Sequence, residues 1–156
     1  MVNGGLLDRS APRHYLIGML SSSRFVVAIH ALSVIARSGG RNPVCSTVVA
    51  QSVNTNPVVI RRLMRDLEKA ELVSSATGRS GGFTLSREPG NITLADIYRA
   101  VEDEGTFRMH KTDPQSRCPV GCQILKILSA PLQSAESALA HSLAKTTLKD
   151  IAAQIA

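Results

Sequence analysis

Residues 45–86 read CSTVVAQSVNTNPVVIRRLMRDLEKAELVSSATGRSGGFTLS. A short helix is expected over 47–52, with Ser46 as its cap and with Val48, Val49 and Val53 turned inward. A turn follows at Asn54-Thr55. Asn56 is a favoured helix N-cap, and Pro57 stands at the first helical position, where its missing N–H costs nothing. The order of short helix, turn, second helix and glycine-tipped hairpin predicts a winged helix-turn-helix. The expected fold is mainly α with a small β-hairpin wing.

The second helix of this run combines an apolar stripe with a basic face. The stripe consists of Ile60, Leu63, Met64, Leu67 and Ala70, which recur at helical spacing. Side chains on the first turns of a recognition helix reach base edges in the major groove, where arginine suits guanine, asparagine suits adenine and valine suits the thymine methyl group. The sequence therefore assigns DNA binding to Asn56, Val58, Val59, Arg61, Arg62 and Arg65.

The hairpin turn over residues 77–82 reads TGRSGG. Glycines adopt backbone angles that other residues avoid, and they let the backbone approach a DNA minor groove. Arg79 at the tip is a candidate for entering that groove.

The net charge of +6 is unevenly distributed. Residues 20–89 carry nine lysines and arginines against four acids, whereas residues 90–156 carry seven of each. The excess lies on the expected helix-turn-helix, where phosphate contacts are made. Double-stranded DNA is the expected partner, and a winged helix used for protein contacts is the alternative.

The chain divides into four expected parts. They are an N-terminal extension (1–20), the winged helix-turn-helix (21–89), a connecting helix and sensor loop (90–121), and a dimerisation helix with a C-terminal helix (122–156). The first helix is expected from about 23 to 38, and capping-box-like starts stand at Thr93 and Thr147.

A long amphipathic helix is expected from residue 122 onward. Its stripe consists of Leu125, Leu128, Leu132, Ala135, Leu139 and Leu143. Because the winged helix has its own core, this stripe is expected to cover a second copy of the chain, which places two recognition helices about 34 Å apart, one turn of DNA. Pro131 is expected to kink or restart the helix, with Ser129 as a new cap.

Three cysteines, an odd count, argue against a disulfide framework. Cys118 and Cys122 stand near a helix start and are either redox-sensing thiols or buried, inert residues. If both were helical, their side chains would lie about 5–6 Å apart, too far for an unstrained disulfide. Pro119 and Gly121 argue against regular helix there. Cys45 is expected to be structural.

The remaining patterns exclude several function classes. His14, His30, His110 and His141 lack zinc-site spacing, so no metal is expected, and His30 is interpreted as a satisfied core histidine. No Cys-x-x-Cys motif is present, which leaves a thiol oxidoreductase as a remote alternative and predicts that the chain is not an enzyme. No apolar run approaches a membrane span, and the first twenty residues lack a secretory pattern. The expected location is the cytoplasm.

With these motifs in place, residues 20–156 resemble the Rrf2 family of bacterial transcription regulators, the IscR, NsrR and CymR type, and most of all its YwnA-like branch. The resemblance to the family rests on Arg24-Phe25, the run from Leu63 to Ser75, Gly78-x-x-Gly81-Gly82-Phe83, Ile92-Thr93-Leu94 and Thr147-Leu148-Lys149-Asp150. The resemblance to the YwnA-like branch rests on Val27-Ala28-Ile29-His30, the run from Ser52 to Val59 and Cys118-Pro119-Val120-Gly121. It implies a homodimeric DNA-binding regulator, usually a repressor. Carried over by position, it implies DNA contacts at Asn56, Val58, Val59 and Arg61, and at Thr77 and Gly78 in the wing.

The sensor loop departs from the family pattern. Cluster-binding relatives carry three cysteines there, and this chain carries only Cys118 and Cys122. An iron–sulfur cluster needs four ligands, so His14, His30, His110 or the other subunit would have to complete it. No cofactor is therefore expected. An iron–sulfur-dependent regulator is the alternative to one that responds to cysteine oxidation or to a ligand.

Overall fold

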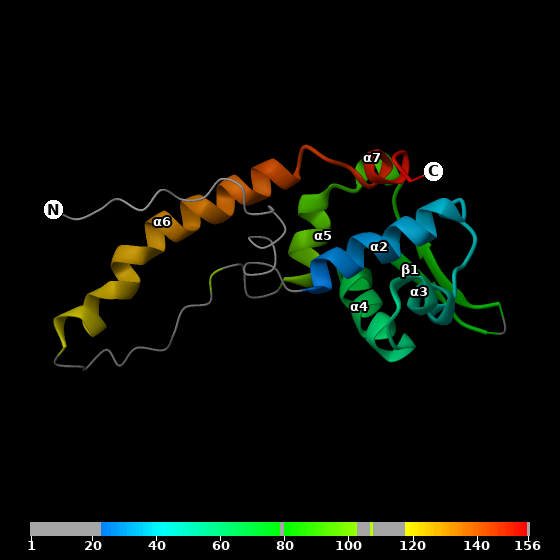
Figure 1. Ribbon diagram of the computed structural model, residues 1–156, viewed down its shortest axis with the longest axis horizontal. Helices are drawn as coiled ribbons and strands as arrows, with labels where there is room; N and C mark the ends of the chain where they lie inside the picture. Colours follow the sequence, from blue (N-terminus) through cyan, green and yellow to red (C-terminus); the bar gives the residue numbers. More distant parts are fainter. Residues whose placement is uncertain (1–22, 79, 103–106, 108–117, 156) are drawn as a thin grey trace, which may run out of the picture.

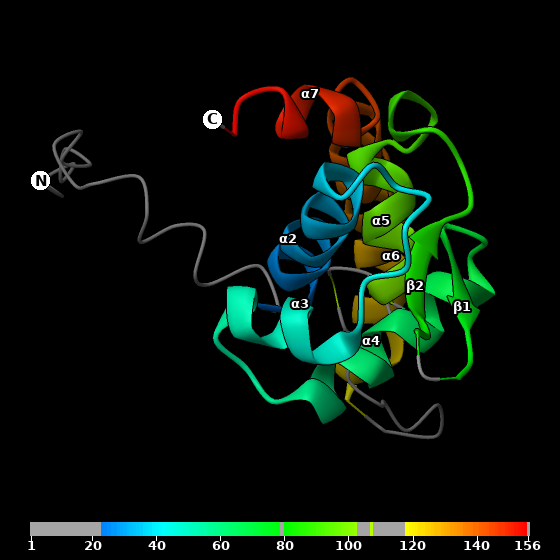
Figure 2. The same cartoon turned by 90° about the vertical axis from the view of Figure 1, so that its right-hand side faces the viewer.

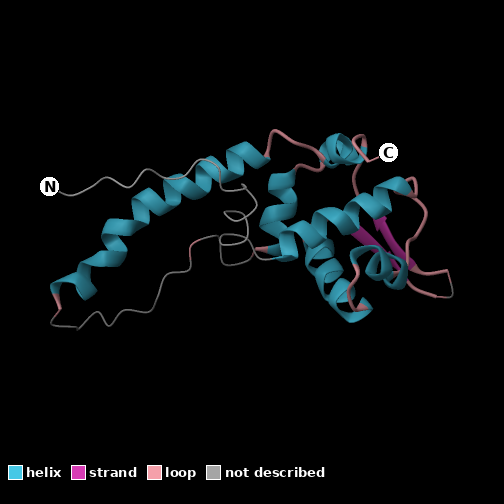
Figure 3. Cartoon of the chain, viewed as in Figure 1, coloured by secondary structure: helices cyan, strands magenta, loops and turns pink. Residues whose placement is uncertain are grey.

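The computed structural model describes residues 23–78, 80–102, 107 and 118–155. Its elements in chain order are α2 (Ser23–Arg37), α3 (Ser46–Val53), α4 (Pro57–Lys69), β1 (Val73–Ala76), β2 (Gly82–Leu85), the short 3-10 helix η1 (Pro89–Asn91), α5 (Leu94–Val101), α6 (Pro119–Leu143) and α7 (Leu148–Ala152). Figures 1 and 3 show a helical body with one small hairpin, from which α6 projects. The predicted mainly helical fold with a hairpin wing and a long C-terminal helix is confirmed.

The core is aliphatic and is built around α2, which packs against α3, α4, α5, β2 and α7. Its fully buried larger side chains include Leu32, Ile35, Val49, Ile60, Met64, Leu67, Leu72, Ile92, Ile97 and Leu148. Each such side chain contributes about 1.5–3 kcal/mol by leaving water. The apolar stripe predicted for α4 therefore faces this core, which directs the opposite, basic side of the helix to solvent.

The turn between α3 and α4 is closed by backbone geometry. Asn54 adopts a left-handed conformation (φ 58°), and the N–H of Thr55 donates to the carbonyl of Ala50 at 2.9 Å. Val49 is buried as expected, but the expectation that Val48 points inward is wrong, because 47% of its surface is exposed. The helix α3 lies between core and solvent, so adjacent valines cannot both be covered.

The hairpin is attached to the body through its second strand. β1 and β2 pair antiparallel from Val73↔Leu85 to Ala76↔Gly82. On the outer edge of β2, Phe83 exchanges two backbone hydrogen bonds with Val44, at 2.9 and 3.0 Å. A Cβ atom at Gly82 would lie 2.6 Å from the Val44 backbone, so this approach requires glycine.

Two predicted capping boxes are confirmed, at the starts of α5 and α7. Thr93 and Asp96 exchange side-chain and backbone hydrogen bonds, and Thr147 and Asp150 do the same. The two starts are joined, because the N–H of Leu94 donates to Thr146 at 2.9 Å and the N–H of Leu148 donates to Ile92 at 2.8 Å. The chain after α6 is thereby returned to the body (Figure 2).

The long helix differs from the expectation in two ways. It begins at Pro119 rather than at residue 122, because proline is favoured at the first helical position. It also continues through Pro131 without restarting, and the Ser129 hydroxyl donates to the Lys126 carbonyl at 2.8 Å instead of capping a new helix. None of the α6 side chains that the structure describes is buried. None of the described helices has both the length and the apolar character needed to cross a bilayer.

Candidate nucleic-acid interface

The first turn of α4 and the turn of the hairpin lie at the same end of the molecule (Figures 1 and 2). Asn56 fixes the start of α4, because its Oδ1 accepts a hydrogen bond from the Val58 N–H at 2.8 Å. This cap occupies the acceptor that a paired contact with adenine would need. The structure therefore gives Asn56 a capping role and leaves its Nδ2 group as a donor.

Four of the predicted DNA-binding side chains share the solvent face of α4. Val58 and Val59 are 54% and 51% exposed on its first turn. Arg62 and Arg65 are also exposed, and neither forms an ion pair with a residue that the structure describes. Two apolar contact groups next to two guanidinium groups can meet thymine methyls, guanine edges or phosphates.

Arg61 lies at the flank of this face. One of its guanidinium nitrogens lies 3.3 Å from the hydroxyl oxygen of Ser46, the first residue of α3, and donates a hydrogen bond to it. Ser46 is therefore not the N-cap that the sequence indicated. Cys45 occupies that position. The α3 start orients Arg61.

Both acids of α4 are bound to neighbouring elements. The carboxylate of Asp66 forms ion pairs with Arg24 of α2 at 2.6 Å and with Lys69 at 3.5 Å. The carboxylate of Glu68 accepts hydrogen bonds from the backbone N–H and the hydroxyl of Ser75 in β1, at 3.1 and 2.6 Å. These bonds draw the negative charges away from the basic face, which stays available for phosphates.

The wing supplies a second exposed segment. Thr77 is exposed, and Gly78 has φ 105°, a conformation that favours glycine. A Cβ atom at Gly81 would lie 2.5 Å from the Ala76 carbonyl oxygen, so the tight turn also depends on that glycine. Arg79 lies outside the described residues, and its place in the minor groove stays a prediction.

Cys45 is exposed, so the expectation of a structural cysteine is wrong. Its Sγ atom lies 2.8 Å from Oγ1 of Thr47. This hydrogen bond, together with one from the Val48 N–H, lowers the pKa of the Cys45 thiol below its ordinary value of 9.0. Cys45 is the N-cap residue of α3, without a side-chain capping hydrogen bond, and it lies at the protein surface.

The two candidate sensor thiols stand at the start of α6. Cys118 is its N-cap and Cys122 lies within its first turns, with the Cys122 N–H donating to the Cys118 carbonyl at 3.1 Å. Both are exposed, which excludes the alternative of buried, inert residues. The expectation that this segment would not form regular helix is wrong, because Pro119 fits the first helical position.

The described donors do not fit an iron site. Within the described ranges, no group of three or more His, Cys, Asp and Glu side chains comes together. His30 is exposed rather than in the core, and its Nε2 lies 2.9 Å from the Ser52 hydroxyl. His14 and His110 lie outside the described residues. The two thiols at the start of α6 fall short of the four ligands that a cluster requires.

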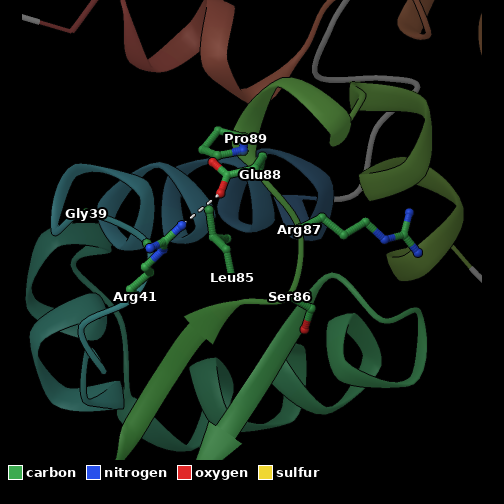
Figure 4. Close-up of a pocket in the computed structure, with 8 residues that line it drawn as sticks. Gly39, Arg41, Leu85, Ser86, Arg87, Glu88 and Pro89 are labelled. Carbon is green, nitrogen blue, oxygen red and sulfur yellow. Dashed lines mark hydrogen bonds and ion pairs between the residues drawn. The ribbon is translucent and has the colours of Figure 1, made fainter.

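A hollow elsewhere on the body does not belong to this interface. Gly39, Arg41 and residues 85–89 line it (Figure 4). Arg41 and Glu88 form an ion pair across it at 3.5 Å, with side chains that are 90% and 73% exposed, so the pair adds little stability. The hollow adjoins Leu85, the end of β2 that lies away from the wing turn.

Comparisons with known proteins agree with this geometry. A family described as "Iron-dependent Transcriptional regulator", Rrf2, matches residues 21–154. The chain belongs to the Rrf2 family. It is a DNA-binding transcriptional regulator and not an enzyme, as the sequence predicted.

Individual Rrf2 relatives extend over most of the chain. YwnA of Bacillus subtilis (strain 168), described as a candidate HTH-type transcriptional regulator, is 40% identical over 131 residues, which are 83% of this chain and 95% of YwnA. A crystal structure of a candidate DNA-binding protein is 37% identical with a TM-score of 0.64, covering 83% of this chain and 98% of that one. The structure of CymR, described as the global cysteine regulator of B. subtilis, is 25% identical with a TM-score of 0.58, covering 87% and 98%.

Three residues around this interface were missed by the sequence reasoning. Arg24, Ser46 and Ser75 contact α4 side chains that are 42, 15 and 7 positions away along the chain. The periodicity of apolar residues within one helix or strand carries no information on side-chain contacts between separate elements. The only sequence signal was that each residue stands near the end of an element, where a side chain can reach a neighbouring element.

Proposed function

We propose that this Rrf2 regulator is a homodimeric repressor. Each subunit would read one half-site with Val58, Val59, Arg62 and Arg65 of α4 in the major groove, with Arg61 and Asn56 at the flank of the contact. The wing residues Thr77, Gly78 and Arg79 would follow the adjacent minor groove. The observation that carries the proposal is the solvent face of α4, where apolar side chains stand next to two arginines that form no ion pair with any residue the structure describes.

The bare long helix supports the homodimer. Val120, Ile127 and Leu128 are 66%, 62% and 37% exposed on α6. Large apolar side chains at this exposure, on a helix none of whose described side chains is buried, favour a partner surface of the same kind. A second copy related by a two-fold axis is the simplest partner, because such an interface is self-complementary and gives two α4 helices the spacing of one DNA turn.

The thiols at the start of α6 support a redox response. Oxidation by hydrogen peroxide would join Cys118 Sγ to Cys122 Sγ, with the two thiol protons and two electrons reducing the peroxide to two water molecules. Thiols one helical turn apart cannot form an unstrained disulfide, so the first turn of α6 would have to unwind. That change would reach the dimer helix directly. A regulator acting on DNA in this way is expected in the cytoplasm.

The test compares DNA binding by matched variants. Duplexes enriched from a random-sequence pool by the wild-type protein serve as the probe. Arg62→Ala with Arg65→Ala should weaken binding at least about tenfold, because each lost contact is worth roughly 1–3 kcal/mol. The control, Lys126→Ala with Lys145→Ala, removes the same charge from outside the interface and should bind nearly as the wild type does. Equal affinity in both double variants would contradict the proposed reading face.

A further inference from the structure

A glutamate on the recognition helix holds the wing. In the register of the hairpin, Ser75 stands opposite Phe83. Both backbone groups of Phe83 are bonded to Val44, on the side away from β1. In an antiparallel pair, the backbone N–H and C=O groups of two opposite residues either both point toward the partner strand or both point away from it. The N–H of Ser75 therefore points out of the hairpin, along the free edge of β1.

The Glu68 carboxylate provides the hydrogen-bond acceptor for this N–H group on the free edge of β1. Its Oε1 atom accepts the Ser75 N–H at 3.1 Å and the Ser75 hydroxyl at 2.6 Å. Hydrogen bonds to an ionised carboxylate are roughly twice as strong as neutral ones. The hairpin is thus held on both outer edges, by Val44 on β2 and by Glu68 on β1.

The placement of this acid runs against simple electrostatics. Glu68 lies on the helix that carries Arg61, Arg62, Arg65 and Lys69, where a carboxylate repels DNA phosphates. The hydrogen bonds to Ser75 give it a compensating role, because Ser75 is two residues from Thr77 and the wing turn. From this geometry we infer that Glu68 is a positioning residue, which sets the wing at a fixed angle to the recognition helix so that both grooves are contacted together.

The inference rests on the DNA binding proposed above. Its test uses duplexes enriched from a random-sequence pool by the wild-type protein, with two footprints. Hydroxyl-radical cleavage reports protection along the minor groove, and dimethyl sulfate reports guanine N7 in the major groove. Glu68→Ala should lose the minor-groove protection, keep the N7 protection, and bind roughly fivefold to tenfold more weakly.

Two variants separate positioning from charge. Glu68→Gln keeps an acceptor oxygen for Ser75 and should restore both footprints. Glu88→Ala removes the same charge at an exposed site away from the wing and should leave both footprints intact. Ser75→Ala, which keeps the strand backbone, should weaken the minor-groove protection in the same direction, and it serves as the test if thermal unfolding shows that Glu68→Ala does not fold.

Three results would overturn the inference. They are retained minor-groove protection in Glu68→Ala, tighter binding by that variant as charge alone predicts, and failure of Glu68→Gln to restore the footprint. A wild-type protein that protects neither groove would instead overturn the proposed DNA binding, and the inference with it.

Discussion

At the scale of single residues, two non-glycine positions in the described part of the chain hold a left-handed backbone. Asn54 (φ 58°) closes α3 and Glu71 (φ 56°) follows α4. Asparagine tolerates this conformation because its short side chain bonds locally, whereas glutamate has no such compensation. The backbone at Glu71 is fixed by the N–H of Leu72, which donates to Leu67 at 3.0 Å. The strain is therefore imposed by the way α4 ends before β1.

Replacing Glu71 by glycine should stabilise the protein. Relief of the left-handed conformation is worth about 1–2 kcal/mol, and the greater freedom of glycine in the unfolded chain offsets about 0.5–1 kcal/mol of it. The free energy of unfolding by urea should rise by about 0.5–1 kcal/mol. Glu71→Ala keeps the Cβ atom and should leave it nearly unchanged. A glycine variant no more stable than the alanine variant would contradict this account of the strain.

Local signals at single residues were predictable from sequence, and pairings between elements were not. Each helix start is indicated by residues close together in the sequence: Asn56 with Pro57 for α4, Thr93 with Asp96 for α5, and Thr147 with Asp150 for α7. The bonds of Asp66 to Arg24 and of Glu68 to Ser75 depend on how helices and hairpin pack. The exposed state of Cys45 likewise follows from where α3 begins, which differs from the expected start by one residue.

At the scale of elements, the starts of α5 and α7 depend on two ionised carboxylates. Burial raises the pKa of Asp96, but hydrogen bonds from Thr93 and the nearby Arg99 and Arg87 charges outweigh it, so the pKa lies below its ordinary 3.8. Hydrogen bonds from the Thr147 side chain and backbone lower the pKa of Asp150 below the same value. Each carboxylate therefore binds protons less readily in the folded chain than in the unfolded one.

Because both carboxyl pKa values are lower in the folded chain than in the unfolded one, acid should destabilise the folded protein. The stabilisation is fully present above the ordinary carboxyl pKa, and it is lost as the pH falls through about 4 and then through the lowered folded values. The unfolding free energy of the wild type should therefore fall over this range more steeply than that of Asp96→Asn with Asp150→Asn, which has no carboxylate to protonate at either cap. Chemical denaturation at a series of pH values measures both slopes, and identical slopes would contradict the account.

The long helix α6 gives the element-scale prediction for assembly. Leu128 is 37% exposed on the leucine stripe, whereas Ser137, nine residues on, is exposed and points about 180° away around the helix. A charge at Leu128 would face the second copy, so Leu128→Asp should raise the dimer dissociation constant at least about tenfold. Ser137→Asp, with the same added charge, should sediment as the wild type does in analytical ultracentrifugation. A monomeric wild type, or a dimer untouched by Leu128→Asp, would refute this assignment.

The sequence correctly predicted that α6 exists, but not where it begins or that it continues through Pro131. Leucine spacing indicated an amphipathic helix, and that spacing does not depend on the rest of the fold. The start at Pro119 and the continuity through Pro131 were misjudged, because a proline is compatible with either a helix end or a helix start. The division of the chain into four functional parts stays a prediction.

At the scale of the whole molecule, the charge and the apolar surface are separated. The basic excess belongs to residues 20–89, which include α4 and the wing, while residues 90–156 are neutral and include the long helix α6 with its exposed apolar side chains. The family and this fold establish a DNA-binding regulator. Its assembly and signal are proposals that rest on α6 and its two thiols.

The most direct test of the central claim is to sequence the duplexes that the wild-type protein enriches from a random-sequence pool at physiological salt. A two-fold dimer reading DNA through α4 predicts one dominant, near-palindromic consensus, with half-sites about one helical turn, roughly 10 base pairs, apart. A pool without any enriched sequence, or a single half-site without its symmetric partner, would contradict it.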